Sequence, residues 1–188
     1  MTAFQKITLS AIFFLLGILP SVSAQNSESP VQSQSKVTNY LSCEGYGSIT
    51  YNGHTIDEFN ATKGILGNLK QLVGPPTSIN TENSIIGEVT YIYNGTRVTF
   101  RESELKVINI TTTNWPVSIL GNDIRIGTSF SSLEQRFGSN LITTAALENP
   151  KGDYAVSFNC DINEADGLNI EFNSKTDRAV QINYWVNP

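Results

Sequence analysis

Histidine is the residue that most often moves a proton in hydrolases, and this chain of 188 residues contains one, His54. It stands in the run N-G-H-T, which is typical of a tight hairpin turn. No serine lies in a G-x-S-x-G motif, the pattern of a nucleophile elbow. The sequence therefore predicts no Ser-His-Asp hydrolase, and we expect His54 to be an exposed turn residue.

Cys43 and Cys160 are the other candidates for a nucleophile or a metal ligand. One histidine and two distant cysteines do not supply the closely spaced ligands of a zinc site. The N-terminus predicts export, as described below, and an oxidising compartment favours a disulfide between Cys43 and Cys160. Two unpaired buried thiols are the alternative.

The acidic loop Asp161–Gly167 (D-I-N-E-A-D-G) is the best candidate for a metal site. Calcium loops need oxygen ligands at positions 1, 3 and 5 and a carboxylate at position 12. Counted from Asp161, position 5 is Ala165 and position 12 is Phe172. The pattern fails, so a solvated turn is the default, calcium is a minor alternative, and we expect no metal and no cofactor.

Paired carboxylates could hydrolyse glycosidic bonds, and Glu102 and Glu104 lie close together in the run R-E-S-E-L. That run has the composition of a hairpin turn, where charge usually faces solvent. The sequence predicts no catalytic residue, and an enzyme acting on carbohydrates through Glu102 or Glu171 is a remote alternative.

The charge of the chain argues against nucleic acid as a ligand. Seventeen acidic and twelve basic side chains give a formal net charge of -5. A phosphate backbone attracts clustered Lys and Arg, and no window of this sequence supplies a basic stripe.

The first 24 residues have the pattern of a signal peptide. Lys6 supplies a positive charge, Ile7–Leu19 is apolar, and Val22-Ser23-Ala24 is a small-residue cleavage site. The apolar run is too short to cross about 30 Å of hydrocarbon at roughly 1.5 Å per residue. We expect cleavage near Ala24, a periplasmic or secreted mature protein without a membrane span, and a disordered tether over the Ser- and Gln-rich residues 25–39.

Several stretches of the chain repeat an earlier pattern. Gly53–Ile56 aligns with Gly121–Ile124, and Leu69–Gly74 aligns with Leu133–Gly138. Further on, the matching residue lies 72 positions away in four pairs: Val98 with Ile170, Phe100 with Phe172, Ile108 with Val180, and Ile110 with Ile182. Such self-similarity predicts a tandem repeat, residues 40–115 and 116–188, within one compact domain. Chance is the alternative, because the matches are mostly apolar residues and glycine.

Hydrophobic periodicity predicts one helix and several strands in each copy. The expected helices are Asn60–Val73 and Ser131–Phe137. The expected strands are Gly45–Tyr51, His54–Ile56, Glu88–Tyr93, Thr96–Arg101, Leu105–Thr112, Val117–Leu120, Asp123–Ile126, Tyr154–Asn159, Leu168–Asn173 and Ala179–Val186. The turn Asn94-Gly95 places Tyr91 opposite Val98 and Thr90 opposite Thr99.

The expected fold class is α+β, a tandem repeat of helix plus antiparallel strands, with the helices packed on one face of an antiparallel sheet and the other face open. In the second copy, three sets should point inward: Tyr154, Val156 and Phe158; Leu168, Ile170 and Phe172; Val180, Ile182 and Tyr184.

The phrase I-R-I-G-T-S, a helix that ends in L-E-Q-R-F-G, and the three strands that follow resemble the β-lactamase inhibitor protein-like group. The outer-membrane assembly lipoproteins of the SmpA/OmlA type open their single unit with a similar phrase. The resemblance implies a helix-backed sheet whose exposed face grips another protein. Here each copy is expected to have one helix rather than a helical hairpin, and the lipid-attachment cysteine is missing.

Binding is the function that this pattern favours, because Arg and Trp are enriched at protein interfaces. The predicted partner-binding face contains Arg97, Thr99, Arg101, Asn109, Glu171, Gln181, Asn183 and Trp185. The alternative for the tryptophans is structural: Trp185 covers a core edge and Trp115 fills the junction between the copies. We expect an exported, non-enzymatic inhibitor or immunity-type protein whose partner is an enzyme or toxin; an envelope-assembly component is the alternative.

Overall fold

The computed structural model describes residues 39–83, 86–145, 151–160 and 166–186. The contacts divide the chain into two units, Met1–Ser35 and Lys36–Pro188, and all described residues belong to the second. The predicted signal peptide and most of the predicted tether lie outside the described residues. Asn39, the last residue assigned to the tether, is part of a strand.

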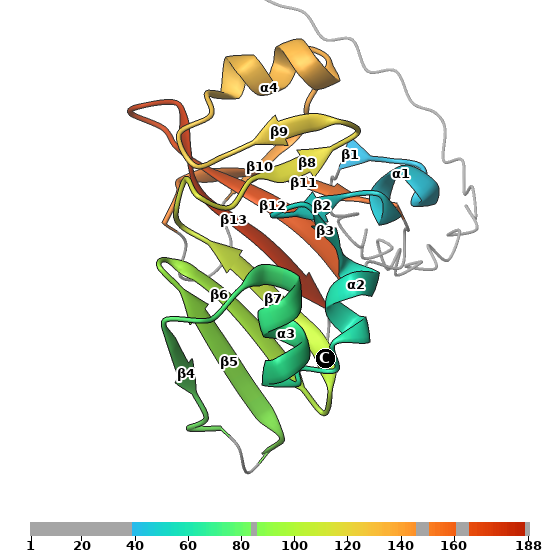
Figure 1. The fold of residues 1–188 in the computed structure, drawn as a ribbon. Coiled ribbons are helices and arrows are strands. Elements are labelled where there is room, and N and C mark those ends of the chain that lie inside the picture. Colours follow the sequence, from blue (N-terminus) through green and yellow to red (C-terminus); the bar gives the residue numbers. More distant parts are fainter. Residues whose placement is uncertain (1–38, 84–85, 146–150, 161–165, 187–188) are drawn as a thin grey trace, which may run out of the picture. The chain divides into compact units, whose positions relative to one another are not determined.

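The larger sheet of the described part has nine strands in the order β1-β11-β12-β13-β7-β6-β5-β4, with β10 also paired to β11 (Figure 1). The pair β1 and β11 is parallel and the other pairs are antiparallel, so this sheet is mixed. Its strands are β1 (Asn39–Tyr40), β4 (Ser78–Asn80), β5 (Glu88–Tyr93), β6 (Thr96–Arg101), β7 (Glu104–Ile110), β10 (Thr143–Ala145), β11 (Tyr154–Asn159), β12 (Asp166–Asn173) and β13 (Arg178–Val186).

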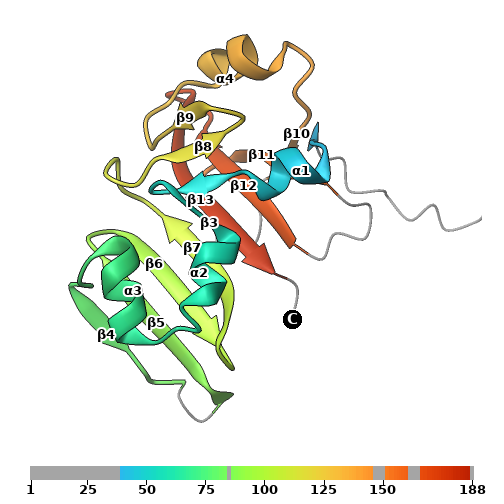
Figure 2. The ribbon, with the colours of Figure 1, turned by 45° about the vertical axis from the view of Figure 1, so that its right-hand side comes forward.

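A second, smaller sheet packs against the larger one (Figure 2). The contacts between them include the ring pair of Tyr51 and Tyr184, whose centroids lie 5.8 Å apart. Its four strands are β2 (Thr50–Tyr51), β3 (His54–Thr55), β8 (Val117–Ile119) and β9 (Asn122–Ile124), in the order β3-β2-β8-β9. Between residues 39 and 186 the described helices are α1 (Cys43–Gly47), α2 (Ile56–Ala61), α3 (Leu66–Val73) and α4 (Phe130–Phe137).

The predicted fold class, an α+β tandem repeat with helices packed on one face of an antiparallel sheet, is wrong. The described chain is mostly β, with a large mixed sheet, a second sheet and short helices. The helix predicted over Asn60–Val73 is interrupted, because Lys63 and Gly64 both have left-handed backbone angles (φ 51° and 62°) that end an α-helix. Two short helices replace the one long helix: α2 ends at Ala61 and α3 begins at Leu66.

Many strand boundaries and registers were predicted correctly. Tyr91 faces Val98 and Thr90 faces Thr99, as the two-residue turn requires, and Asn94 and Gly95 both have positive φ. Strands β1, β4 and β10 were not predicted, and the predicted strand Gly45–Tyr51 is wrong over residues 45–47, which belong to helix α1. The strands that were missed have two or three residues each, too few for a periodic pattern to be read from sequence.

Helices α3 and α4 correspond closely. Each has eight residues, each ends at a glycine with positive φ, Gly74 or Gly138, and each has one fully buried residue, Leu69 or Leu133. These features lie where the repeated motif aligned the two segments. The division into two copies at 40–115 and 116–188 stays a prediction.

The constant spacing of 72 does not extend to the last strand of each half. Val98 pairs with Ile108, and Ile170 pairs with Ile182, so the registers equate Ile108 with Ile182 and not with Val180. The cause is the length of the turn before the last strand. This turn spans Glu102–Ser103 in one half and the longer segment Ser174–Asp177 in the other. With a spacing of 74, Asn109 matches Asn183, and these two asparagines are paired where β7 meets β13.

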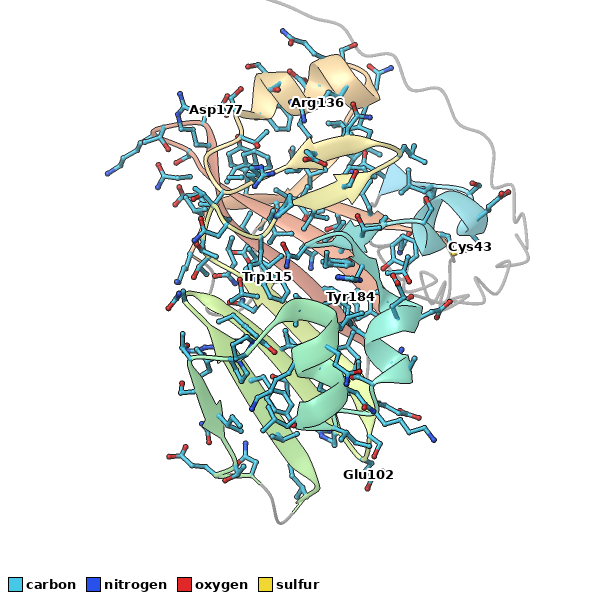
Figure 3. All side chains as sticks on the ribbon, viewed as in Figure 1. Cys43, Glu102, Trp115, Arg136, Asp177 and Tyr184 are labelled. Carbon is cyan, nitrogen blue, oxygen red and sulfur yellow. A yellow bond between two sulfur atoms is a disulfide. The ribbon has the colours of Figure 1, made fainter. Side chains whose placement is uncertain are left out.

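The core lies between the large sheet and the layer formed by the small sheet and helices. Leu168, Ile170 and Phe172 point into it, as predicted. Val180 was assigned to the same face but is only half-buried, because a register shift in β12–β13 places Ala179 opposite Phe172. Trp115 is also buried in this core (Figure 3).

Candidate binding face

The outer face of the large sheet, which points away from the core, carries a row of polar residues across four neighbouring strands. Arg97 on β6 pairs with Asn109 on β7, Asn109 pairs with Asn183 on β13, and Asn183 pairs with Asn169 on β12. Adjacent strands lie about 4.8 Å apart, so these side chains form one continuous row. We call it the central polar row.

A groove of about 700 Å³ lies on this face over β5, β6, β7 and β13. Four residues of the predicted binding face line it: Arg97, Thr99, Asn109 and Gln181. Thr90 and Lys151, which the sequence analysis did not assign to the face, also line it. Thr90 could have been found from the predicted register, because it lies opposite Thr99 on the same face.

Side-chain hydrogen bonds hold the amides of the face in place. The Asn109 amide donates to the Asn183 oxygen, which also accepts from Gln181 Nε2 at 3.1 Å. The Asn183 amide in turn donates to Glu171 Oε1 at 2.9 Å. Because the amides of Asn109, Gln181 and Asn183 have fixed partners, they are oriented before any ligand arrives.

Glu171 belongs to this network and not to an open surface. Its side chain is 2% exposed, and its second oxygen accepts hydrogen bonds from the backbone N–H groups of Lys151 (3.0 Å) and Gly152 (3.2 Å). These donors satisfy the buried carboxylate and fix residues 151 and 152 over β12. The expectation of a fully open face is therefore wrong at β12, where Asn169 is also buried.

Gly152 has no room for a side chain. A Cβ there would lie 2.8 Å from both the backbone N and O of Phe172 and 2.9 Å from the Glu171 Cβ. We expect Gly152→Ala to lower the free energy of unfolding by about 1–3 kcal/mol, because the segment must move and loosen its bonds to Glu171. Urea denaturation measures this. Gly67→Ala in α3 is the control, since its Cβ would meet nothing within 4 Å; an equal loss in both variants would contradict the packing argument.

The remaining residues of the predicted face lie outside the groove lining. Arg101 pairs with Glu88 at 3.1 Å. The hydrogen bond from Asn83, and after it the one from Arg101, lowers the pKa of Glu88 below its usual value. Trp185 packs against Gly167, where an added Cβ would lie 2.9 Å from the indole ring. Both side chains therefore have structural contacts of their own.

The electrostatic character of the groove differs from that of the chain. Arg97 and Lys151 line it and none of the described lining residues is a carboxylate, whereas the whole chain has a net charge of -5. Both cationic residues are exposed, and no described carboxylate pairs with either. The groove is therefore a positive patch on an acidic protein, and an anionic ligand would find unpaired donors there.

The residues considered for catalysis lie elsewhere. His54 was expected to be an exposed turn residue, but it is half-buried in β3, where it contacts Glu58 at 3.6 Å and the ring of Phe59. Glu102 and Glu104 line a separate cavity of about 640 Å³ that Asp166 and Tyr184 also line. Glu104 pairs with Lys106 at 2.8 Å, which lowers the pKa of this carboxyl.

The described residues contain no group of three or more His, Cys, Asp or Glu side chains that could hold a metal ion. Most of the candidate calcium loop, residues 161–165, lies outside them.

The predicted disulfide between Cys43 and Cys160 is confirmed. The two Cα atoms lie 4.7 Å apart, and the bond joins α1, which begins at Cys43, to the end of β11 (Figure 3). The disulfide fits an exported protein. None of the helices in the described ranges is long and apolar enough to cross a membrane.

Comparison with known proteins identifies no family. No family model and no curated protein matches the chain. Among solved structures, it is similar to an extracellular protein containing an SCP domain from Bacillus anthracis, with 18% sequence identity and a TM-score of 0.38. The match covers 66% of this chain and 43% of the other, so the chain spans less than half of that protein's length.

Proposed function

We propose that this chain is an exported, non-enzymatic protein-binding module of the inhibitor or immunity type, and that it holds its partner, an enzyme or toxin, in the outer-face groove. The observation that carries the proposal is the groove itself: an exposed, unpaired Arg97 stands beside amides that are already hydrogen-bonded in place. Arginine next to a rigid polar floor is a frequent source of binding energy at protein interfaces.

The position of the groove supports the same function. Its floor belongs to the long central strands β6, β7 and β13, which are paired on both sides. A rigid floor reduces the ordering cost of binding, because few side chains lose freedom when a partner arrives. The disulfide supports the export of the protein, and we propose cleavage near Ala24 and a periplasmic or secreted location.

Affinity capture with matched variants tests the proposal. Tagged protein, Arg97→Asp and Lys70→Asp are each incubated with periplasmic and secreted fractions, and bound proteins are identified by mass spectrometry. Lys70 is exposed on α3 and does not line the groove, so its variant makes the same charge change elsewhere. Arg101 and Trp185 are unsuitable for the test, because their contacts with Glu88 and Gly167 confound stability with binding.

We expect the wild-type protein and Lys70→Asp to retain one partner in stoichiometric amount, and Arg97→Asp to weaken its binding by about tenfold or more. A partner that all three proteins retain equally would contradict the assignment of the groove. Recovery of envelope-assembly proteins alone would favour an envelope-assembly component instead.

A further inference from the structure

The chemistry of the groove restricts the kind of partner segment that it accepts. This inference rests on the proposed function and deepens it. The Arg97 guanidinium offers a planar pair of N–H donors, which suits the two oxygens of a carboxylate. Lys151 offers a second cation, and no carboxylate among the lining residues that the structure describes competes for either.

The two cations lie on opposite sides of the paired asparagines. Arg97 is on β6, and the backbone N–H of Lys151 donates to Glu171 on β12, three strands away. Glu171 lies two residues along β12 from Asn169, which is in the same row as Arg97. At about 4.8 Å per strand and 3.3 Å per residue, the backbones of Arg97 and Glu171 are roughly 16 Å apart. In an extended peptide, side chains four residues apart point the same way and lie roughly 13 Å from each other, so the long side chains of Arg97 and Lys151 must cover the remainder.

The residues between the two cations suit a peptide backbone. Asn109 and Gln181 line this part of the groove, and side-chain amides can both donate to a carbonyl and accept from an N–H. Thr90 and Thr99 share a hydrogen bond of 2.9 Å and also line the groove, where Thr99 lies opposite Val107. Within the described ranges no aromatic side chain lines the groove, whereas sugar rings are commonly held by packing on aromatic rings.

We propose that the groove binds an extended acidic segment of the partner protein, with one carboxylate on Arg97, a second carboxylate about four residues away on Lys151, and the intervening backbone on the amides of Asn109 and Gln181. The segment crosses the strands of the sheet. An anionic polysaccharide is the competing ligand that the experiment must distinguish.

Fluorescence anisotropy with labelled octapeptides tests this inference. The probe is a Gly-Ser peptide with glutamate at positions 2 and 6, and the reference peptides have glutamine or lysine at both positions. The proteins are the wild type, the double variant Arg97→Gln with Lys151→Gln, and the double variant Lys70→Gln with Lys175→Gln. The last pair is the control, since it removes two exposed positive charges outside the groove.

We expect the wild type and the control to bind the glutamate peptide at least about tenfold more tightly than the glutamine peptide. The double variant Arg97→Gln with Lys151→Gln, the groove variant, should lose this preference. Reversing both charges, in Arg97→Glu with Lys151→Glu, should make the protein prefer the lysine peptide. Because this is a gain of binding, it would also show that the variant is folded. Raising the salt concentration should weaken the binding of the glutamate peptide more than that of the glutamine peptide, because salt screens exposed ion pairs.

Three results would overturn the inference. The wild type does not bind the glutamate peptide, or the variant Arg97→Gln with Lys151→Gln and the control lose equal affinity for this peptide. The third is that the wild type binds polygalacturonate in preference to the peptide. A failure of this inference can be distinguished from a failure of the proposed function. If Arg97→Asp abolishes partner capture while the peptide does not bind, the groove is the interface and only the acidic character of the partner segment is wrong.

Discussion

Replacement of Trp115 with alanine is expected to lower the free energy of unfolding by about 3–5 kcal/mol, among the larger costs of a single core substitution. Trp115 is 6% exposed, and its ring lies 5.3 Å from the ring of Tyr93 on β5 and 6.3 Å from that of Phe59 on α2. The residue thus joins the large sheet to the layer that covers it. Its loss leaves a cavity that elements from three parts of the chain must close.

Urea denaturation followed by circular dichroism measures this loss, and Trp185→Ala is the control. Trp185 is the other tryptophan of the chain and is only half-buried, on the outer face. We expect a clearly smaller loss there. Equal losses in the two variants would show that Trp115 does not have the central packing role that its contacts indicate.

Removal of the disulfide by Cys43→Ala with Cys160→Ala is expected to cost about 2–5 kcal/mol of unfolding free energy. The bond closes a long loop, with a sequence separation of 117, so its loss gives the unfolded chain much more freedom. It also fixes α1 to the end of β11, next to the short parallel pair of β1 and β11.

The reductant dithiothreitol provides the matched comparison for this prediction. Reduced wild-type protein and the double alanine variant should unfold at similar urea concentrations, and the reductant should not change the variant. A variant as stable as the oxidised wild type would contradict the prediction, since the disulfide would then contribute nothing to stability.

The hairpins of this fold could be predicted from sequence because local chemistry determines them. Asn94-Gly95 permits the positive φ angles of a two-residue turn, and the turn then fixes which residues of β5 and β6 face each other. The period of two in β12 likewise predicted that Leu168, Ile170 and Phe172 are buried together.

The wrong predictions concern features that depend on the rest of the fold. A helix over Asn60–Val73 fits the apolar spacing, but the chain turns at Lys63 and Gly64, and an added Cβ on Gly64 would lie 2.9 Å from the Phe100 ring. The burial of Val180 was overestimated because a register shift cannot be read from alternation.

The candidate site was predicted in part. Arg97, Thr99, Asn109 and Gln181 share the groove because alternation on neighbouring strands sets their direction. The Glu171 side chain points to the outer face, as predicted, but it is buried. Residues 151 and 152 cover it through backbone hydrogen bonds that no sequence pattern predicts. Lys151 was missed for the same reason: its place over β12 depends on those bonds.

Site-specific photo-crosslinking tests the central claim, that the outer-face groove is the binding site, most directly. A photoreactive amino acid at Thr99, inside the groove, is compared with the same amino acid at Lys70 on α3, using the partner-containing fractions. The account predicts one crosslinked partner from position 99 and none from position 70. A partner crosslinked from position 70 and not from position 99 would contradict it.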